Sequence, residues 1–155
     1  LLGAETLEQL ALNHTLFEFL ETQEFGNEPL IDALGGWLAT AEAFRGQRLI
    51  CYHKNWAYFE DRFGIRCTDY VETKPGISPT PRHVARLIQR MQEENLDVLL
   101  AATYFDRNKV ETVATRGGAT AVYVPLSPGA RQGIDDYFTL VDSWVDDLAQ
   151  AFLSR

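Results

Sequence analysis

Residues 49–60 read Leu-Ile-Cys-Tyr-His-Lys-Asn-Trp-Ala-Tyr-Phe-Glu. The apolar run that opens this stretch is typical of a short buried strand, and Trp56, Phe59 and Phe63, three and four residues apart, indicate one face of a helix. His53 is therefore placed where the carboxyl end of a strand turns into a helix, the edge at which open α/β sheets bind ligands. The positive end of the helix dipole disfavours imidazolium, so we expect a neutral imidazole that can ligate a metal. A core or capping histidine is the alternative.

Outward from this stretch, strand and helix patterns alternate to the end of the chain. The predicted strands are residues 47–52, 66–72, 98–102 and 119–124, and the predicted helices are residues 54–63, a segment from Pro81, a segment after Asp106 and the last segment of the chain. Helical crossovers of this length imply parallel strands. The pattern predicts an α/β domain, three-layer α/β/α with a four-stranded parallel sheet, over residues 47–155.

Residues 1–46 are predicted to form a preface or insertion of short helices. The patterns Thr6-x-x-Gln9 and Thr15-x-x-Glu18 are typical of capping boxes that start helices. His14 lies between the two patterns and is expected on the surface. No residue of this segment indicates a catalytic or metal-binding site.

Composition narrows the class of protein. The chain has 155 residues, 46% of them hydrophobic, and a net charge of -8, which argues against a nucleic-acid surface because phosphate contacts need clustered Lys and Arg. No apolar run approaches the roughly 20 residues of a membrane span. The chain starts at Leu1 without an initiator Met or a signal peptide, so we expect a fragment or a processed chain.

The two cysteines are expected to be buried thiols. Cys51 is placed late in one strand and Cys67 early in the next. In a parallel pair these positions are predicted to lie most of a strand length apart, beyond the Cα separation of about 7 Å that a disulfide allows.

Several classes of active site are excluded by missing motifs. The turn after the first strand has no glycine, which excludes a Rossmann dinucleotide site, and neither a Walker A sequence nor a Gly-x-Ser-x-Gly elbow is present. His83 falls in the first turn of a helix and is expected to be exposed. His53, with Glu72 and Asp106 from neighbouring loops, is the remaining candidate for a divalent metal site.

Each candidate carboxylate has a structural alternative. Glu72 could be a strand-end charge in water, and Asp106 is more simply interpreted as the N-cap of the helix that follows it. Asp135 and Asp136 open the last helix, where acidic residues suit the dipole. Trp56 and Trp144 fall at helical core spacing.

Four segments together resemble one known family. They are residues 52–59, YHKNWAYF; residues 71–81, with Val-Glu, Lys-Pro-Gly-Ile and two further prolines; residues 101–106, with Ala-Ala and Tyr-Phe-Asp; and residues 124–127, VPLS. This set is similar to the zinc/manganese substrate-binding proteins of ABC transporters, metal-binding lipoproteins also described as adhesins. The match runs in order over roughly residues 35 to 153.

The resemblance implies that the chain is the C-terminal lobe of a two-lobe protein whose N-terminal lobe is absent here. Members of this family hold the metal between the lobes with two histidines of the N-terminal lobe, a residue matching His53 and a carboxylate of the loop after the fourth strand. That loop, residues 125–133, contains no Asp, Glu or His in this chain. Glu72, Asp106 or a water would then complete the site.

The resemblance also implies a function without bond chemistry, so the chain is not expected to be an enzyme. The whole protein would capture Zn²⁺, or Mn²⁺, in the periplasm or outside the cell, with a membrane anchor in the full-length protein. It would deliver the ion to an ABC permease. Two alternatives stay open: a metal-independent adhesin, interaction module or metallochaperone, and a small metal-dependent hydrolase.

Overall fold

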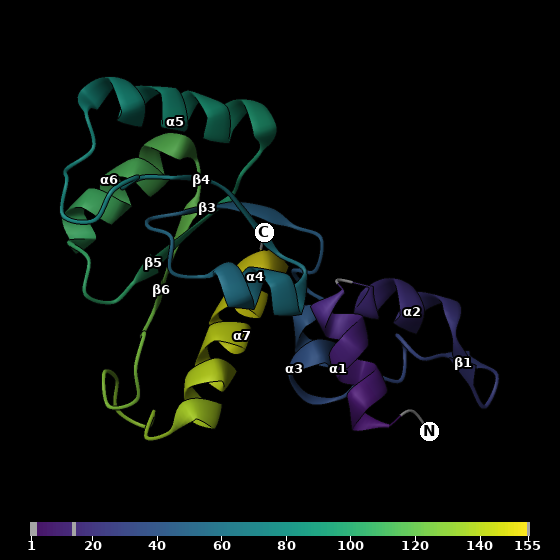
Figure 1. The fold of residues 1–155 in the computed structure, drawn as a ribbon. Helices are drawn as coiled ribbons and strands as arrows, with labels where there is room; N and C mark the ends of the chain where they lie inside the picture. The colour runs from purple at the N-terminus through teal and green to yellow at the C-terminus, as the bar shows by residue number, and fades with distance from the viewer. Residues whose placement is uncertain (1–2, 14, 155) are drawn as a thin grey trace. The chain divides into compact units, whose positions relative to one another are not determined.

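A computed structural model describes residues 3–13 and 15–154, and the chain divides into two compact units, residues 1–40 and 41–155 (Figure 1). The first unit is built from short elements: α1 (Ala4–Leu12), α2 (Leu16–Thr22), β1 (Glu24–Phe25), β2 (Glu28–Pro29) and most of α3 (Gly36–Ala41). His14, which was expected on the surface, lies outside the described residues.

The helix starts of the first unit differ from the capping-box prediction. Helix α1 begins after Gly3 with no side-chain cap, so Thr6 lies inside the helix and its predicted role is wrong. Thr15 is the N-cap residue of α2, but its hydroxyl donates to the carbonyl oxygen of Leu10 at 3.4 Å. A polar side chain at a helix start competes for several local main-chain partners, and here the preceding helix end supplies the partner.

The second unit is an α/β domain whose elements follow the predicted order. They are β3 (Arg48–Cys51), α4 (Ala57–Phe63), β4 (Arg66–Tyr70), α5 (Pro81–Glu94), β5 (Val98–Ala102), α6 (Arg107–Gly117), β6 (Thr120–Val124) and α7 (Tyr137–Leu153). The four strands form one sheet in the order β4-β3-β5-β6, and all three neighbouring pairs are parallel. The predicted fold class is confirmed.

Helices cover both faces of this sheet (Figure 1). Ile50, Leu99 and Ala101 face the side where α5 and α6 pack, with Met91 and Val110 in the same buried cluster. On the opposite face an aromatic cluster links the segment before β3 to α4 and α7. Its members are Phe44, Phe59, Phe63, Trp144 and Phe152. Alternate residues of β3 and β5 thus point to two cores, which explains the apolar run of residues 49–51 and the wholly apolar sequence of β5.

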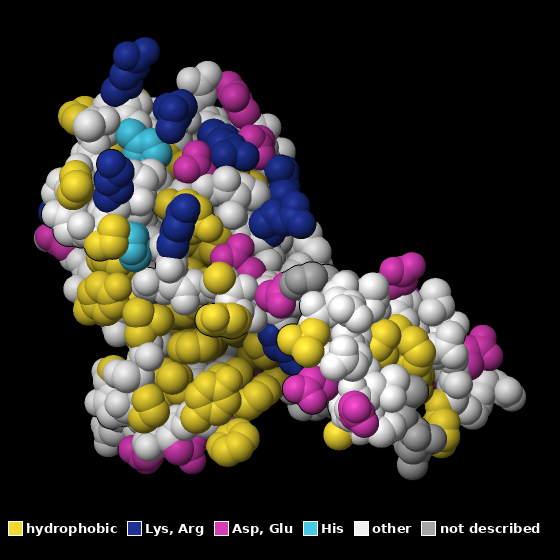
Figure 2. Space-filling model, viewed as in Figure 1, with side chains coloured by type: hydrophobic (Ala, Val, Ile, Leu, Met, Phe, Trp, Pro, Cys, Tyr) yellow, Lys and Arg dark blue, Asp and Glu magenta, His cyan; other side chains and the backbone are white. Residues whose placement is uncertain are grey.

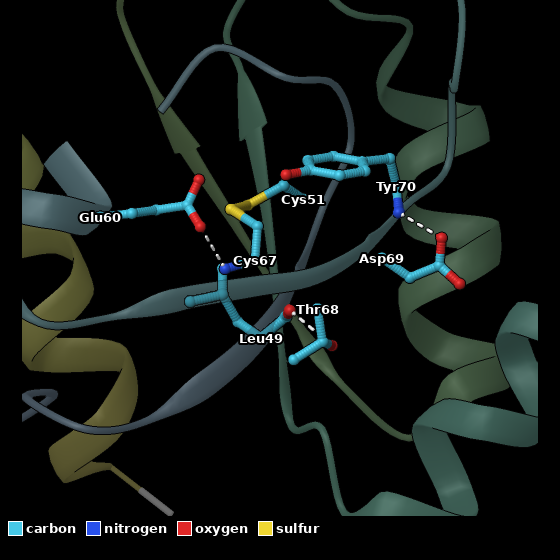
Figure 3. Close-up of a disulfide and its surroundings, with 7 residues drawn as sticks. All are labelled: Leu49, Cys51, Glu60, Cys67, Thr68, Asp69 and Tyr70. Atoms are coloured by element: carbon cyan, nitrogen blue, oxygen red, sulfur yellow. Dashed lines mark hydrogen bonds between the residues drawn. A yellow bond between two sulfur atoms is a disulfide. The ribbon is translucent and has the colours of Figure 1, made fainter. Parts of the chain in front are cut away.

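Cys51 and Cys67 form a disulfide, so the predicted pair of free thiols is wrong (Figure 3). The strands are only four and five residues long, and Cys67 is paired in register with Leu49, two residues before Cys51. The register shifts between Leu49 and Ile50, and the two cysteine Cα atoms lie 5.5 Å apart, within the range a disulfide bridges. The bridge joins β3 to β4, the outermost strand on that side of the sheet, and both cysteines are buried.

Within residues 3–13 and 15–154, no helix combines the length and the apolar character that crossing a membrane requires.

Candidate metal site

The loops that follow the four parallel strands meet at one edge of the sheet. Hydrogen bonds continue between the chains beyond the strand ends: Tyr52 N–H donates to Leu100 O at 2.7 Å, and Glu72 N–H donates to Tyr52 O at 2.8 Å. On the other side, Thr103 N–H donates to Val124 O at 3.0 Å. The residues that leave β3, β4 and β5 are therefore held at fixed positions rather than on free loops.

His53 is oriented by the main chain of its neighbour strand. Its Nδ1 lies 2.9 Å from the carbonyl oxygen of Glu72, and the ring is half-buried. A carbonyl oxygen can only accept a hydrogen bond, so Nδ1 is the nitrogen that carries hydrogen. In the neutral ring this leaves a lone pair on Nε2, for which the described residues supply no hydrogen-bond donor. A histidine fixed by one nitrogen on a main-chain carbonyl, with the other open, has the arrangement found in metal-ligating histidines.

One aromatic ring, Phe105, lies beside the imidazole, and two tyrosines pack against that ring. Phe105 lies 6.4 Å from the His53 ring between centroids, and it packs against both Tyr52 and Tyr104 at 4.3 Å. Asn55 Nδ2 donates to the Tyr104 hydroxyl at 3.2 Å, which joins the loop after β3 to the loop after β5. These contacts place an aromatic cluster on one side of the His53 ring.

The two candidate carboxylates have different surroundings. Asp106 is exposed and is the N-cap of α6, where its Oδ1 accepts from Asn108 N–H at 2.9 Å and from Lys109 N–H at 3.3 Å. Its interpretation as a helix cap is confirmed. The Glu72 side chain is half-buried. The pKa of Tyr52 is raised, first by burial and then by the negative charges of Glu72 and Asp106, so both carboxylates act on the same phenol.

The three candidates do not form a compact cluster. Among the residues that the structure describes, no three His, Cys, Asp or Glu side chains are grouped so that they could hold a metal ion. Glu72 contacts His53 through its main-chain oxygen. A sequence pattern cannot show this contact, since any residue at position 72 offers the same carbonyl.

A second histidine is anchored at the same strand end. His83 Nε2 donates to the carbonyl oxygen of Tyr70 at 2.8 Å, and its Nδ1 accepts from Arg86 Nη2 at 3.0 Å. The ring is half-buried, so the expectation of an exposed side chain is wrong. The cause is the start of α5, where Thr80 caps the helix and places its first turn against the end of β4.

The tryptophans next to the edge are structural. Trp56 is the N-cap residue of α4, only 2% exposed, and meets the half-buried Trp144 edge to face at 5.5 Å. Trp144 Nε1 donates to Pro125 O at 2.5 Å and holds the loop after β6. Asp136 accepts from Thr139 N–H in a capping box at the start of α7, which confirms its structural interpretation.

A known protein family matches most of the chain. The profile of a family described as zinc-uptake complex component A, periplasmic, matches residues 30–151. A curated relative, the high-affinity zinc uptake system protein ZnuA of Haemophilus influenzae, is 23% identical over 96 residues, which cover 61% of this chain and 28% of that protein.

Solved structures share the fold at low sequence identity. The laminin-binding protein Lmb of Streptococcus agalactiae, described as having adhesin and metal-transporting activity, is 18% identical with a TM-score of 0.58, over 75% of this chain and 45% of that one. FpvC of Pseudomonas aeruginosa, solved with Mn²⁺, is 19% identical with a TM-score of 0.56, over 97% and 48%. A structure of ZnuA is 22% identical with a TM-score of 0.58, over 74% and 42%. The chain spans less than half the length of each of these relatives.

Proposed function

The chain belongs to the family of periplasmic zinc-uptake components, which serves transport rather than catalysis, and from this premise we propose that it is the part of a substrate-binding protein that supplies His53 to a captured metal ion. The whole protein would hold a divalent transition metal outside the cytoplasm and release it to an ABC permease. Zinc is the favoured ion because nitrogen ligands suit it, and manganese is the second candidate.

The observation that carries this proposal is the polarity of the His53 ring. Its Nδ1 donates to Glu72 O, so in the neutral ring the lone pair is on Nε2, and the Phe105 ring lies against one side of the imidazole. A metal binds the neutral imidazole, and a ring that is already oriented by a hydrogen bond favours that binding.

The other ligands are proposed to come from two sources. Glu72 and, second to it, Asp106 are the carboxylates at the same edge of the sheet, and both influence Tyr52. Histidines of a further lobe would supply the remaining donors, since the relatives are more than twice as long as the part that this chain matches. A zinc site of high affinity needs about four ligands, so this chain alone is expected to bind weakly.

The test is a zinc titration of the 155-residue chain, with its disulfide intact, followed by the NMR signals of the histidine rings. We expect the Nε2 signal of His53 to move and saturate while both signals of His83 stay in place. A His53 ring that does not respond at millimolar zinc would contradict the proposal for this chain. The same titration with manganese ranks the two ions.

A further inference from the structure

A small basic surface lies at the start of α5, beside the end of β4. Thr80, Arg82, His83 and Arg86 line a hollow of about 450 Å³, which we call the α5 hollow. Figure 2 shows Lys and Arg side chains, with a histidine among them, over the part of this face where α5 lies in Figure 1, with Asp and Glu side chains between some of them. The chain as a whole carries a net charge of -8, so this gathering runs against its overall charge.

The cations of the hollow are not neutralised within the part of the chain that the structure describes. Arg82 and Arg86 are exposed and form no ion pair there. Asp69, a carboxylate of neighbouring β4, is paired with Arg90 at 3.3 Å. Lys54 extends the basic surface, since its Nζ lies 5.2 Å above the ring of Tyr70, the residue whose carbonyl accepts from His83.

One of the two guanidinium groups is held in position. His83 is fixed on Tyr70 O, and its Nδ1 accepts from Arg86 Nη2 at 3.0 Å. Arg86 therefore keeps a defined orientation, and its remaining N–H groups stay available. A planar guanidinium fork matches the two oxygens of a carboxylate, and a pre-oriented fork loses less side-chain entropy when it binds.

We propose that the α5 hollow is a docking surface for an acidic segment of a protein partner. Three of its four lining residues are exposed, whereas sites for small molecules enclose most of their ligand. An open surface with two arginines about one helical turn apart suits carboxylates that project from another polypeptide. The proposal does not depend on metal binding, because none of its residues is a candidate ligand.

The test uses a fluorescent peptide of eight glutamates as the probe, with an octaglutamine peptide as the uncharged reference. We expect the 155-residue chain to bind the acidic peptide at low salt, with amide NMR shifts centred on residues 80–86. Arg82→Gln combined with Arg86→Gln should weaken binding by at least about tenfold, since a hydrogen bond to a charged group contributes about that factor or more.

The matched control is Arg62→Gln combined with Arg66→Gln, which removes the same charge from exposed positions elsewhere on the second unit. We expect it to change the affinity by less than about twofold, because surface charges away from the site contribute little. An equal loss in both double variants, or shifts centred away from residues 80–86, would overturn the proposal. Binding to vesicles with anionic lipids but not to the acidic peptide would overturn it as well.

Discussion

His53 and His83 are anchored on the same strand end in opposite ways. His53 donates from Nδ1 to Glu72 O and leaves Nε2 open, whereas His83 donates from Nε2 to Tyr70 O and its Nδ1 accepts from an arginine. Both rings are half-buried, and both anchors are main-chain carbonyls just at or beyond the end of β4. Burial and position in the fold therefore do not distinguish the two rings. The hydrogen-bond partner of each ring nitrogen does, because only His53 keeps a nitrogen free of a protein partner among the described residues.

Loss of the disulfide should have the largest effect on the difference between the two histidines. The bridge joins β3, which His53 follows, to β4, which Glu72 follows. Removing it with Cys51→Ala and Cys67→Ala should lower the free energy of unfolding by about 3 kcal/mol, the value for a closed loop of this size. Urea unfolding measures this. As urea is added to this variant, the NMR signals of the His53 ring should broaden at a lower concentration than those of His83. The reason is that Arg90 of α5 donates to Thr68 O of β4, a contact that does not depend on the disulfide. Broadening of both rings at the same urea concentration would contradict the expectation that the disulfide stabilises the His53 anchor more than the His83 anchor.

The second largest effect is expected in the zinc affinity of variants that lack one of the two histidines. His53→Ala should weaken binding by at least the roughly 10- to 100-fold that loss of an outer-shell partner costs, whereas His83→Ala should leave it nearly unchanged. Calorimetry on the two variants measures the contrast. If His53→Ala binds zinc as tightly as the wild type does, the ligand is another group.

Each histidine also has a helix cap nearby, and the two caps give the smallest effect. Thr80→Ala and Asp106→Ala should each lower the free energy of unfolding by about 1 kcal/mol, and Asp106→Asn should restore most of that loss because Asn is an equally good cap. Thermal unfolding checks this. Because Asp106 is a proposed ligand, Asp106→Asn should weaken zinc binding, by less than His53→Ala does. Thr80→Ala should leave zinc binding unchanged. Unaltered affinity in Asp106→Asn would leave the residue with its cap role alone.

The sequence predicted those parts of the fold that depend on local patterns. Strand 98–102 was predicted with its observed bounds because five consecutive apolar residues needed cover on both faces. Helix α5 begins at Pro81, as predicted, because Thr80 is a capping residue and proline suits the first helical position. The α/β class followed from these elements and their order.

Features that depend on register or on main-chain partners were missed. The disulfide required the offset between β3 and β4, and hydrophobicity does not determine that offset when strands are this short. The anchors of His53 and His83 are carbonyl oxygens, which every residue carries. A third omission, the hairpin of β1 and β2, did have a signal, since Gly26-Asn27 takes positive φ at both turn positions, and these residue types favour such turns.

The disulfide has a practical consequence for anyone who prepares this protein. Cells with a reducing cytosol keep cysteines as thiols, so material produced there would carry free Cys51 and Cys67, with Cα atoms 5.5 Å apart and His53 two residues beyond one of them. Thiolates are preferred zinc ligands. Such a sample would offer the ion a sulfur site that the oxidised protein does not have, and its apparent affinity would describe the preparation rather than the biological site. Quantifying free thiols is therefore the first step of every metal titration proposed above.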